Sequence, residues 1–156
     1  MLTNKLIRLF LLSYLLLNSN YAVSDATNCN NTDTSFNCVK YVRTIDGDTV
    51  VFDLHDVPLY FGKHAHIRIN GIDAPEIHSH NTCEKKAALN AKNRVDQLLK
   101  DAKTINLTDI GKEKYGRILA NIIADGNNIG AILLQEKLAY VYNGGTKKKL
   151  NWCGEK

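Results

Sequence analysis

Residues 39–54 read VKYVRTIDGDTVVFDL, two runs rich in β-branched and aromatic residues around a short polar centre. The runs at 39–45 and 49–54 have the composition of β-strands, and Asp46-Gly47-Asp48 between them is a strong turn signal. This stretch therefore predicts a β-hairpin. Further segments with a strand-like pattern lie at 59–61, 64–69, 104–107 and 117–123.

The middle of the chain changes to a helical period. Apolar residues recur every three or four positions between Cys83 and about Asp101, with charged residues on the other side, which predicts an amphipathic helix. A second, short helix is predicted after Asn127 or Asn128, either of which is a suitable N-cap. About five strands with helices inserted late, and no alternation of strand with helix, indicate an α+β domain built on a small closed barrel.

The first 24 residues have the pattern of a secretory signal peptide. Lys5 and Arg8 precede an apolar run at 9–17, and the small residues Ala22-Val23-Ser24 offer a cleavage site. The alternative is an uncleaved membrane anchor, but the run is short for a bilayer and polar residues follow it. We therefore expect export, either to the periplasm or to the medium.

Beyond the signal, the sequence divides into a leader and one domain. Residues 25–38 are rich in Asn, Thr, Ser and Asp without an apolar period, which predicts a flexible leader. Residues 39–156 have the usual size of a single domain. The chain of 156 residues carries a formal net charge of +4, part of which leaves with Lys5 and Arg8. So mild a positive charge allows binding to a polyanion without demanding it.

All four cysteines lie beyond the signal, as expected for an exported protein with disulfides. Four cysteines allow three pairings. The close spacing of Cys29 and Cys38 favours one local loop in the leader, which leaves Cys83 to pair with Cys153 near the end of the chain. A zinc site is the alternative, but no CxxC pair is present.

Three short charged clusters indicate the chemistry. Asp46-Gly47-Asp48 is followed by Arg68 with Asp73-Ala74-Pro75-Glu76, and then by Lys114-Tyr115-Gly116-Arg117. Carboxylates placed together repel one another unless a cation lies between them, and a hard divalent cation takes oxygen ligands. Because arginine matches phosphate oxygens bidentately, a cation with two arginines indicates phosphodiester chemistry. Each cluster alone is typical of an ordinary polar turn or loop.

Taken in order, these motifs closely resemble the thermonuclease, or staphylococcal nuclease-like, family. The matching segments are Ile45-Asp46-Gly47-Asp48-Thr49-Val50, Arg68, Ile72-Asp73-Ala74-Pro75-Glu76 and Lys114-Tyr115-Gly116-Arg117. The resemblance covers about residues 39–143. It implies a five-stranded OB-type β-barrel with two packed helices, and a secreted monomeric nuclease that uses one calcium ion. Its substrates would be DNA and RNA, hydrolysed to leave 3′-phosphate ends, and no stable protein partner is expected.

The resemblance also implies roles for individual residues. Glu76 would orient or deprotonate the attacking water, and two arginines would hold the scissile phosphate. Two carboxylates and one carbonyl leave most of a calcium shell to water and substrate oxygens, so weak affinity is expected. The implied residues are Arg68, Glu76 and Arg117 for catalysis, Asp48, Asp73 and the backbone carbonyl of Ala74 for the metal, and Lys114, Tyr115 and Tyr142 for the neighbouring nucleotide.

The carboxyl end departs from the family pattern, because the last long helix is missing. Instead, Gly144-Gly145 and the lysines at 147–149 lead to Trp152-Cys153. We expect a disulfide between Cys83 and Cys153 to fasten the chain end in place of that helix. The lysines either contact backbone phosphate or form a solvated tail.

The sequence leaves two other functions open. One is a non-catalytic OB-type module that binds nucleic acid, against which the complete set of acids and arginines argues. The other is a disulfide-stapled surface protein with an interaction role. The histidines could bind a transition metal, but exposed loop and strand positions explain them equally well. They are His64, His66, His78 and His80.

Overall fold

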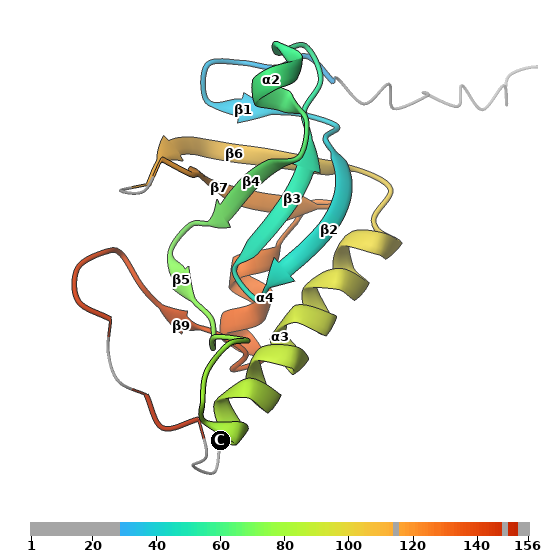
Figure 1. Ribbon diagram of the computed structural model, residues 1–156. Helices are drawn as coiled ribbons and strands as arrows, with labels where there is room; N and C mark the ends of the chain where they lie inside the picture. Colours follow the sequence, from blue (N-terminus) through green and yellow to red (C-terminus); the bar gives the residue numbers. More distant parts are fainter. Residues whose placement is uncertain (1–28, 114–115, 148–149, 153–156) are drawn as a thin grey trace, which may run out of the picture.

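The computed structural model describes residues 29–113, 116–147 and 150–152 (Figure 1). The predicted signal peptide, Lys114, Tyr115 and Cys153 lie outside these ranges. The described elements are β1 (Ser35–Phe36), β2 (Lys40–Asp46), β3 (Thr49–Asp53), α2 (Leu59–Gly62), β4 (Ala65–Ile69), β5 (Ile72–Asp73), α3 (Thr82–Asp101), β6 (Ile105–Lys112), β7 (Ile118–Ala124), β8 (Asn127–Asn128), α4 (Ile129–Gln135) and β9 (Tyr140–Val141).

Most strands belong to one mixed sheet. Its order is β1-β6-β7-β4-β3-β2, with β8 added beside β7, and β5 pairs separately with β9. Neighbouring strands are antiparallel except β4 and β7, which run parallel. The predicted hairpin is formed by β2 and β3, and the five predicted strands correspond to β2, β3, β4, β6 and β7, apart from the segment at 59–61. The α+β class is confirmed.

The expected closed barrel is an open sheet among the described residues. Closure of the barrel would pair β2 with β6. Val39, the residue before β2, donates a backbone hydrogen bond to Ile105 O at the start of β6, at 2.9 Å. The physical reason is that β1 occupies the same edge of β6, pairing Ser35 with Thr108 and Phe36 with Leu107. The backbone groups that would complete a ladder with β2 are thereby taken.

The helix predicted between Cys83 and about Asp101 is α3, which begins one residue earlier. Asn81 is its N-cap, and the Asn81 side chain accepts hydrogen bonds from the backbone N–H groups of Cys83 and Glu84. One face of α3 is buried and packs beside β2 (Figure 1). The buried residues of this face are Ala87, Ala88, Ala91, Val95 and Leu99. The second predicted helix is α4, and its N-cap is Asn128.

The turn between β2 and β3 lies against α3 at Gly47. A Cβ atom at Gly47 would lie 2.7 Å from Ala91 Cβ and 2.8 Å from Ala74 Cβ, distances at which something must shift. Glycine therefore allows the hairpin turn, helix α3 and the turn after β5 to approach one another closely. This contact positions Asp48, which follows Gly47 directly.

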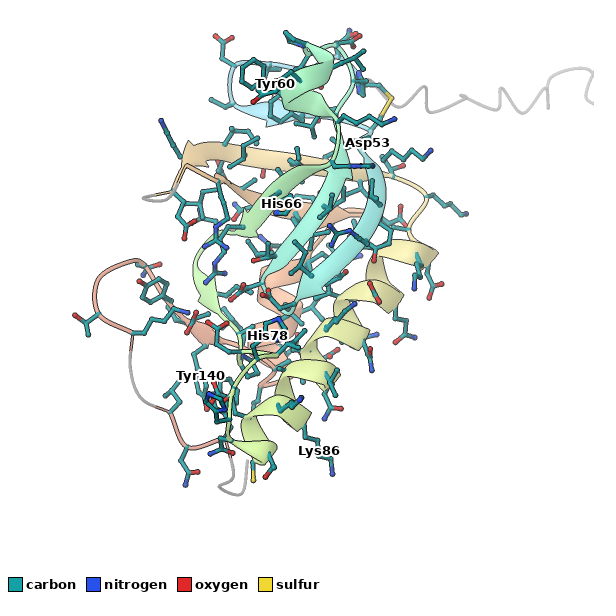
Figure 2. The ribbon with its side chains drawn as sticks, viewed as in Figure 1. Asp53, Tyr60, His66, His78, Lys86 and Tyr140 are labelled. Atoms are coloured by element: carbon teal, nitrogen blue, oxygen red, sulfur yellow. A yellow bond between two sulfur atoms is a disulfide. The ribbon has the colours of Figure 1, made fainter. Side chains whose placement is uncertain are left out.

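The segment at 59–61 was predicted as a strand, and this prediction is wrong. It forms the single helical turn α2, which begins after Pro58, because Pro58 O accepts hydrogen bonds from the N–H groups of Phe61 and Gly62. The side chains of Leu59, Tyr60 and Phe61 are exposed, so the apolar residues of this segment found no place in the core. Figure 2 shows Tyr60 at the end of the molecule that carries α2.

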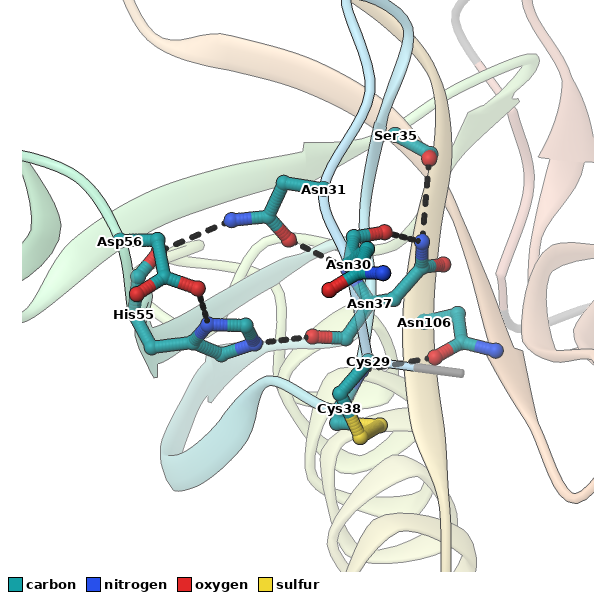
Figure 3. Close-up of a disulfide and its surroundings, with 9 residues drawn as sticks. All are labelled: Cys29, Asn30, Asn31, Ser35, Asn37, Cys38, His55, Asp56 and Asn106. Atoms are coloured by element: carbon teal, nitrogen blue, oxygen red, sulfur yellow. Dashed lines mark hydrogen bonds and ion pairs between the residues drawn. A yellow bond between two sulfur atoms is a disulfide. The ribbon is translucent and has the colours of Figure 1, made fainter. Parts of the chain in front are cut away.

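The local disulfide of the leader is present, since Cys29 and Cys38 are bonded with their Cα atoms 5.2 Å apart (Figure 3). His55 lies beside it: His55 Nε2 donates to Asn37 O, and His55 Nδ1 contacts Asp56 Oδ2 at 2.7 Å. These bonds raise the pKa of His55, the Asp56 carboxylate contributing most. The described part of the leader is thus tied to the loop before α2 and, through β1, to β6.

Cys83 is also bonded in a disulfide. Its expected partner, Cys153, lies outside the described residues, so the pairing of Cys83 with Cys153 stays a prediction. Among the helices that the structure describes, none is long and apolar enough to cross a membrane.

Candidate active site

Three strand ends bring two acids to one arginine. Asp48 directly precedes β3, Arg68 lies on β4 opposite Thr49, and Asp73 ends β5. Arg68 Nη1 lies 2.9 Å from Asp48 Oδ2, and Arg68 Nη2 lies 3.1 Å from Asp73 Oδ1. Only 6% of the Arg68 side chain is exposed, so this ion-pair network is largely removed from water.

Asp48 is held by further hydrogen bonds. Its Oδ2 accepts from the backbone N–H of Ala74 at 2.9 Å, and its Oδ1 accepts from the Thr49 hydroxyl at 3.1 Å. Burial raises the pKa of Asp48 to about 7; the Arg68 charge lowers the pKa, and the nearby Asp46 raises it further. The site therefore contains a buried carboxyl group whose negative charge is not fully compensated by Arg68.

Glu76 follows Asp73 across the Pro75 turn and is much more accessible, with 58% of its side chain exposed. Glu76 Oε1 accepts a hydrogen bond from Lys147 Nζ at 2.8 Å, and the same ammonium group lies 2.9 Å from Asp73 Oδ1. A carboxylate with this exposure can reach a water molecule near Asp73. The sequence indicated Glu76 but gave no sign of its contact with Lys147, which is 71 residues away.

Arg117 is linked to Asp48 through Thr49. Arg117 Nη1 lies 3.5 Å from the Thr49 hydroxyl, which itself donates to Asp48. Glu113 holds this arginine by two contacts, Nε to Oε2 at 2.5 Å and Nη2 to Oε1 at 2.8 Å. The hydrogen bonds from Arg117 lower the pKa of Glu113, which keeps the pair charged.

Glu113 is a residue that sequence reasoning missed. An acid four positions before Arg117 was a signal, but this spacing suggests a pair only on a helix. Here the two residues are brought together by a turn, in which Glu113 N donates to Arg117 O and Gly116 N donates to Glu113 O. The turn conformation could not be read from the motif.

A cleft of about 650 Å³ opens beside Arg68. Glu113, Leu119 and Tyr142 line it, together with residues of the segments that follow β4 and β9. Tyr142 N donates to Gly71 O, and the Tyr142 hydroxyl donates to Gly145 O at 2.8 Å. The cleft thus has polar and apolar walls and leads to the arginine, as a site for a nucleotide would require.

The predicted site residues therefore fall into two groups. Those that the structure brings to one region are Asp48, Arg68, Asp73, Ala74, Glu76 and Arg117, with Tyr142 at the adjoining cleft. Lys114 and Tyr115 lie outside the described residues.

The ligand atoms that the site offers indicate which kind of cation it could bind. Within residues 29–113, 116–147 and 150–152, no group of three or more His, Cys, Asp and Glu side chains is placed to hold a metal ion. Asp48 and Asp73 offer carboxylate oxygens, and Ala74 offers a backbone carbonyl. Such a donor set suits a hard cation that completes its shell with water or substrate, and it does not suit zinc.

Comparison with known proteins gives a family match and several relatives. Residues 66–152 match the family described as "Staphylococcal nuclease homologue". The chain is 34% identical over 110 residues to "Endonuclease YncB" of Bacillus subtilis (strain 168), covering 67% of this chain and 49% of that protein. It is 34% identical over 110 residues to "SPbeta prophage-derived endonuclease YokF" of the same strain, covering 67% of this chain and 35% of the relative.

A further match is an "Uncharacterized endonuclease" of Escherichia coli, 31% identical over 105 residues, covering 66% of this chain and 60% of that protein. The chain spans about half or less of the length of the two Bacillus proteins. The family match includes Arg68, Asp73, Glu76 and Arg117, and it begins after Asp48.

Proposed function

Because the chain belongs to the staphylococcal nuclease homologue family, we propose that it is an exported, calcium-dependent nuclease that hydrolyses phosphodiester bonds of DNA and RNA and leaves 3′-phosphate ends. The observation that supports this most is the meeting of Asp48, Arg68 and Asp73 within 3.1 Å contacts beside a cleft. Acids for a cation and an arginine for phosphate occur together there.

Asp48, Asp73 and the carbonyl of Ala74 are the proposed calcium ligands. All three donors are oxygen atoms, and the incompletely compensated charge of buried Asp48 favours a further cation. Calcium bound there would polarise the phosphate and make a nearby water molecule more acidic. Because the protein supplies few ligands, weak affinity follows, which suits an environment rich in calcium.

Glu76 is the proposed general base. It takes a proton from a water molecule as the water oxygen forms a bond to phosphorus, and the bond from phosphorus to O5′ breaks. The phosphate stays on the 3′ oxygen, and O5′ receives a proton from solvent. Hydrogen-bond reach to the water is the first requirement for such a base, and the exposure of Glu76 beside Asp73 supports this role.

Arg117 and Arg68 are the proposed phosphate ligands. Negative charge grows on the non-bridging oxygens as five-coordinate phosphorus forms, and preorganised donors stabilise that charge. Glu113 fixes the orientation of Arg117 through two contacts, while Asp48 and Asp73 fix Arg68. Lys114, Tyr115 and Tyr142 are proposed to contact the neighbouring nucleotide, and the position of Tyr142 at the cleft supports its part.

Export is proposed on two grounds. The first 24 residues have the pattern of a signal peptide, and the disulfide between Cys29 and Cys38 is compatible with an oxidising compartment. We propose residues 25–38 as the leader and 39–156 as the nuclease domain.

A nuclease assay with two variants tests the proposal. The protein is expected to degrade DNA and RNA with calcium and to stop with a chelator. Glu76→Gln and Arg117→Ala are expected to lose about a hundredfold or more in rate, because each removes a group that acts on the reacting phosphate or water. The 3′ ends of the products should resist terminal transferase until a phosphatase removes the phosphate.

Arg43→Ala is the matched control, because Arg43 is exposed on β2. This variant should cleave at the rate of the unsubstituted protein, and all variants should keep its circular dichroism spectrum. Full activity of both Glu76→Gln and Arg117→Ala would remove the assigned roles. Binding of DNA without any cleavage would favour the non-catalytic alternative.

A further inference from the structure

Lys147 places a third positive group among the proposed active-site acids. Its Nζ lies 2.9 Å from Asp73 Oδ1 and 2.8 Å from Glu76 Oε1, so one ammonium group bridges the two carboxylates. These are the acid proposed to bind calcium and the acid proposed to activate water. The sequence interpretation of the lysine triplet, a phosphate contact or a solvated tail, included no such contact.

The backbone around Lys147 is tied to the segment that carries Asp73. Strand β9 pairs with β5, matching Tyr140 with Asp73, and Figure 1 shows the two strands side by side. After β9, Gly144 and Gly145 adopt φ angles of +92° and +90°, which favour glycine, and Gly145 O accepts from the Tyr142 hydroxyl. The chain turns back within a few residues and brings Lys147 to the acids.

The two cations at Asp73 differ in how easily they can leave. Arg68 also contacts Asp73 Oδ1, but only 6% of the Arg68 side chain is exposed, and this arginine is fixed by Asp48 as well. Lys147 is 49% exposed at the end of a flexible stem. When a divalent cation approaches these acids, Lys147 is therefore the group that can be displaced into solvent at small cost.

We infer that Lys147 is a tethered cation that competes with calcium for Asp73 and Glu76 and thereby weakens the affinity of the site for the ion. The inference rests on the proposed calcium site. An ammonium group and a calcium ion cannot both have full access to the same oxygens, since the two positive charges repel. Because both ion pairs of Lys147 are partly exposed, the effect should be moderate, about three- to tenfold in the dissociation constant.

Calorimetric titration of the full chain with calcium chloride tests the inference. Lys147→Met keeps most of the side-chain stem and removes the charge, and it is expected to bind calcium about three- to tenfold more tightly than the unsubstituted protein. Lys86→Met is the matched control: Lys86 is exposed on α3, at a distance from the sheet (Figure 2), and its removal changes the net charge equally. This control should bind calcium as the unsubstituted protein does.

A second measurement uses the unsubstituted chain. Calcium should increase the rate at which an amine-reactive reagent labels Lys147, followed by mass spectrometry, because displacement frees Nζ; labelling of Lys86 should not change. Equal or weaker calcium binding by Lys147→Met, or unchanged labelling of Lys147, overturns the inference while the calcium site stands. Absence of calcium binding in every variant overturns the site and the inference together.

Discussion

The side chain of Arg68 has two roles. It is proposed to bind phosphate, and it also compensates the buried carboxyl group of Asp48 and the partly buried carboxyl group of Asp73. Removing one partner of a buried ion pair typically costs about 3–5 kcal/mol, because the other charge stays buried without compensation. A loss of activity in an Arg68 variant would therefore not separate catalysis from folding, and for this reason the assay above relies on Glu76 and Arg117.

Asp96 is a charged residue outside the site for which a pH dependence is expected. Burial raises its pKa, but hydrogen bonds from Tyr41, Thr44 and Lys92 outweigh this and lower the pKa to about 2. The ordinary value is 3.8, so the ionised carboxylate stabilises the folded state above about pH 4, and this contribution is lost as the pH falls toward 2. We expect Asp96→Asn to reduce the free energy of unfolding at pH 7 by about 1–2 kcal/mol.

Urea unfolding of both proteins at several pH values measures this contribution. Asparagine resembles the protonated acid, so the two stabilities should converge near pH 2. A control is Asp101→Asn, since Asp101 is exposed at the end of α3. A stability difference that stays constant from pH 7 to pH 2 would contradict the assigned cause.

At the residue scale, the sequence predicted the acids and arginines but not all of their partners. The sequence predicted a common site for Asp48, Arg68 and Asp73, because carboxylates that bind a cation and an arginine that binds phosphate serve the same phosphodiester chemistry. Glu113 and Lys147 were missed because their contacts depend on turns. Contacts made by such turns leave no periodic pattern in the sequence from which they could be predicted.

At the scale of elements, the close approach at Gly47 links the hairpin turn to α3. In Gly47→Ala, the added Cβ would lie within 2.8 Å of Ala91 Cβ and Ala74 Cβ, so the turn and α3 must move apart. We expect a loss of about 1–3 kcal/mol in unfolding free energy. Calcium affinity should also fall, because Asp48 and Ala74 shift relative to one another.

Chemical unfolding and calcium titration measure the two effects. Gly111→Ala is the control, because a Cβ atom there would lie 3.8 Å from Leu119 Cβ, an ordinary contact. Its stability and calcium affinity should change little. If Gly47→Ala matched this control in both measurements, the packing at Gly47 would not be what positions the site.

Elements with a regular apolar period were predicted well, whereas the segment at 59–61 and strand β1 were not. Helix α3 has a buried face from Ala87 to Leu99, which makes its period clear in the sequence. The apolar composition of 59–61 resembled a strand, but Pro58 starts a helical turn there. The pairing of β1 with β6, which leaves the sheet open, depends on a leader whose polar composition gave no strand signal.

At the scale of the whole molecule, the proposed site should contribute to stability through the calcium ion that it is proposed to bind. Calcium that binds only the folded protein should stabilise it by about 1.4 kcal/mol at ten times the dissociation constant, which raises the melting temperature by several degrees. Addition of a chelator should reverse the increase.

Asp48→Asn should lose the calcium-dependent increase, because it removes a proposed ligand, and exposed Asp101→Asn should keep it. Differential scanning calorimetry at pH 8 with and without calcium measures the shift. The same increase in Asp48→Asn and in the unsubstituted protein would mean that calcium binds elsewhere, and the connection between the buried acids and the stability of the fold would be lost.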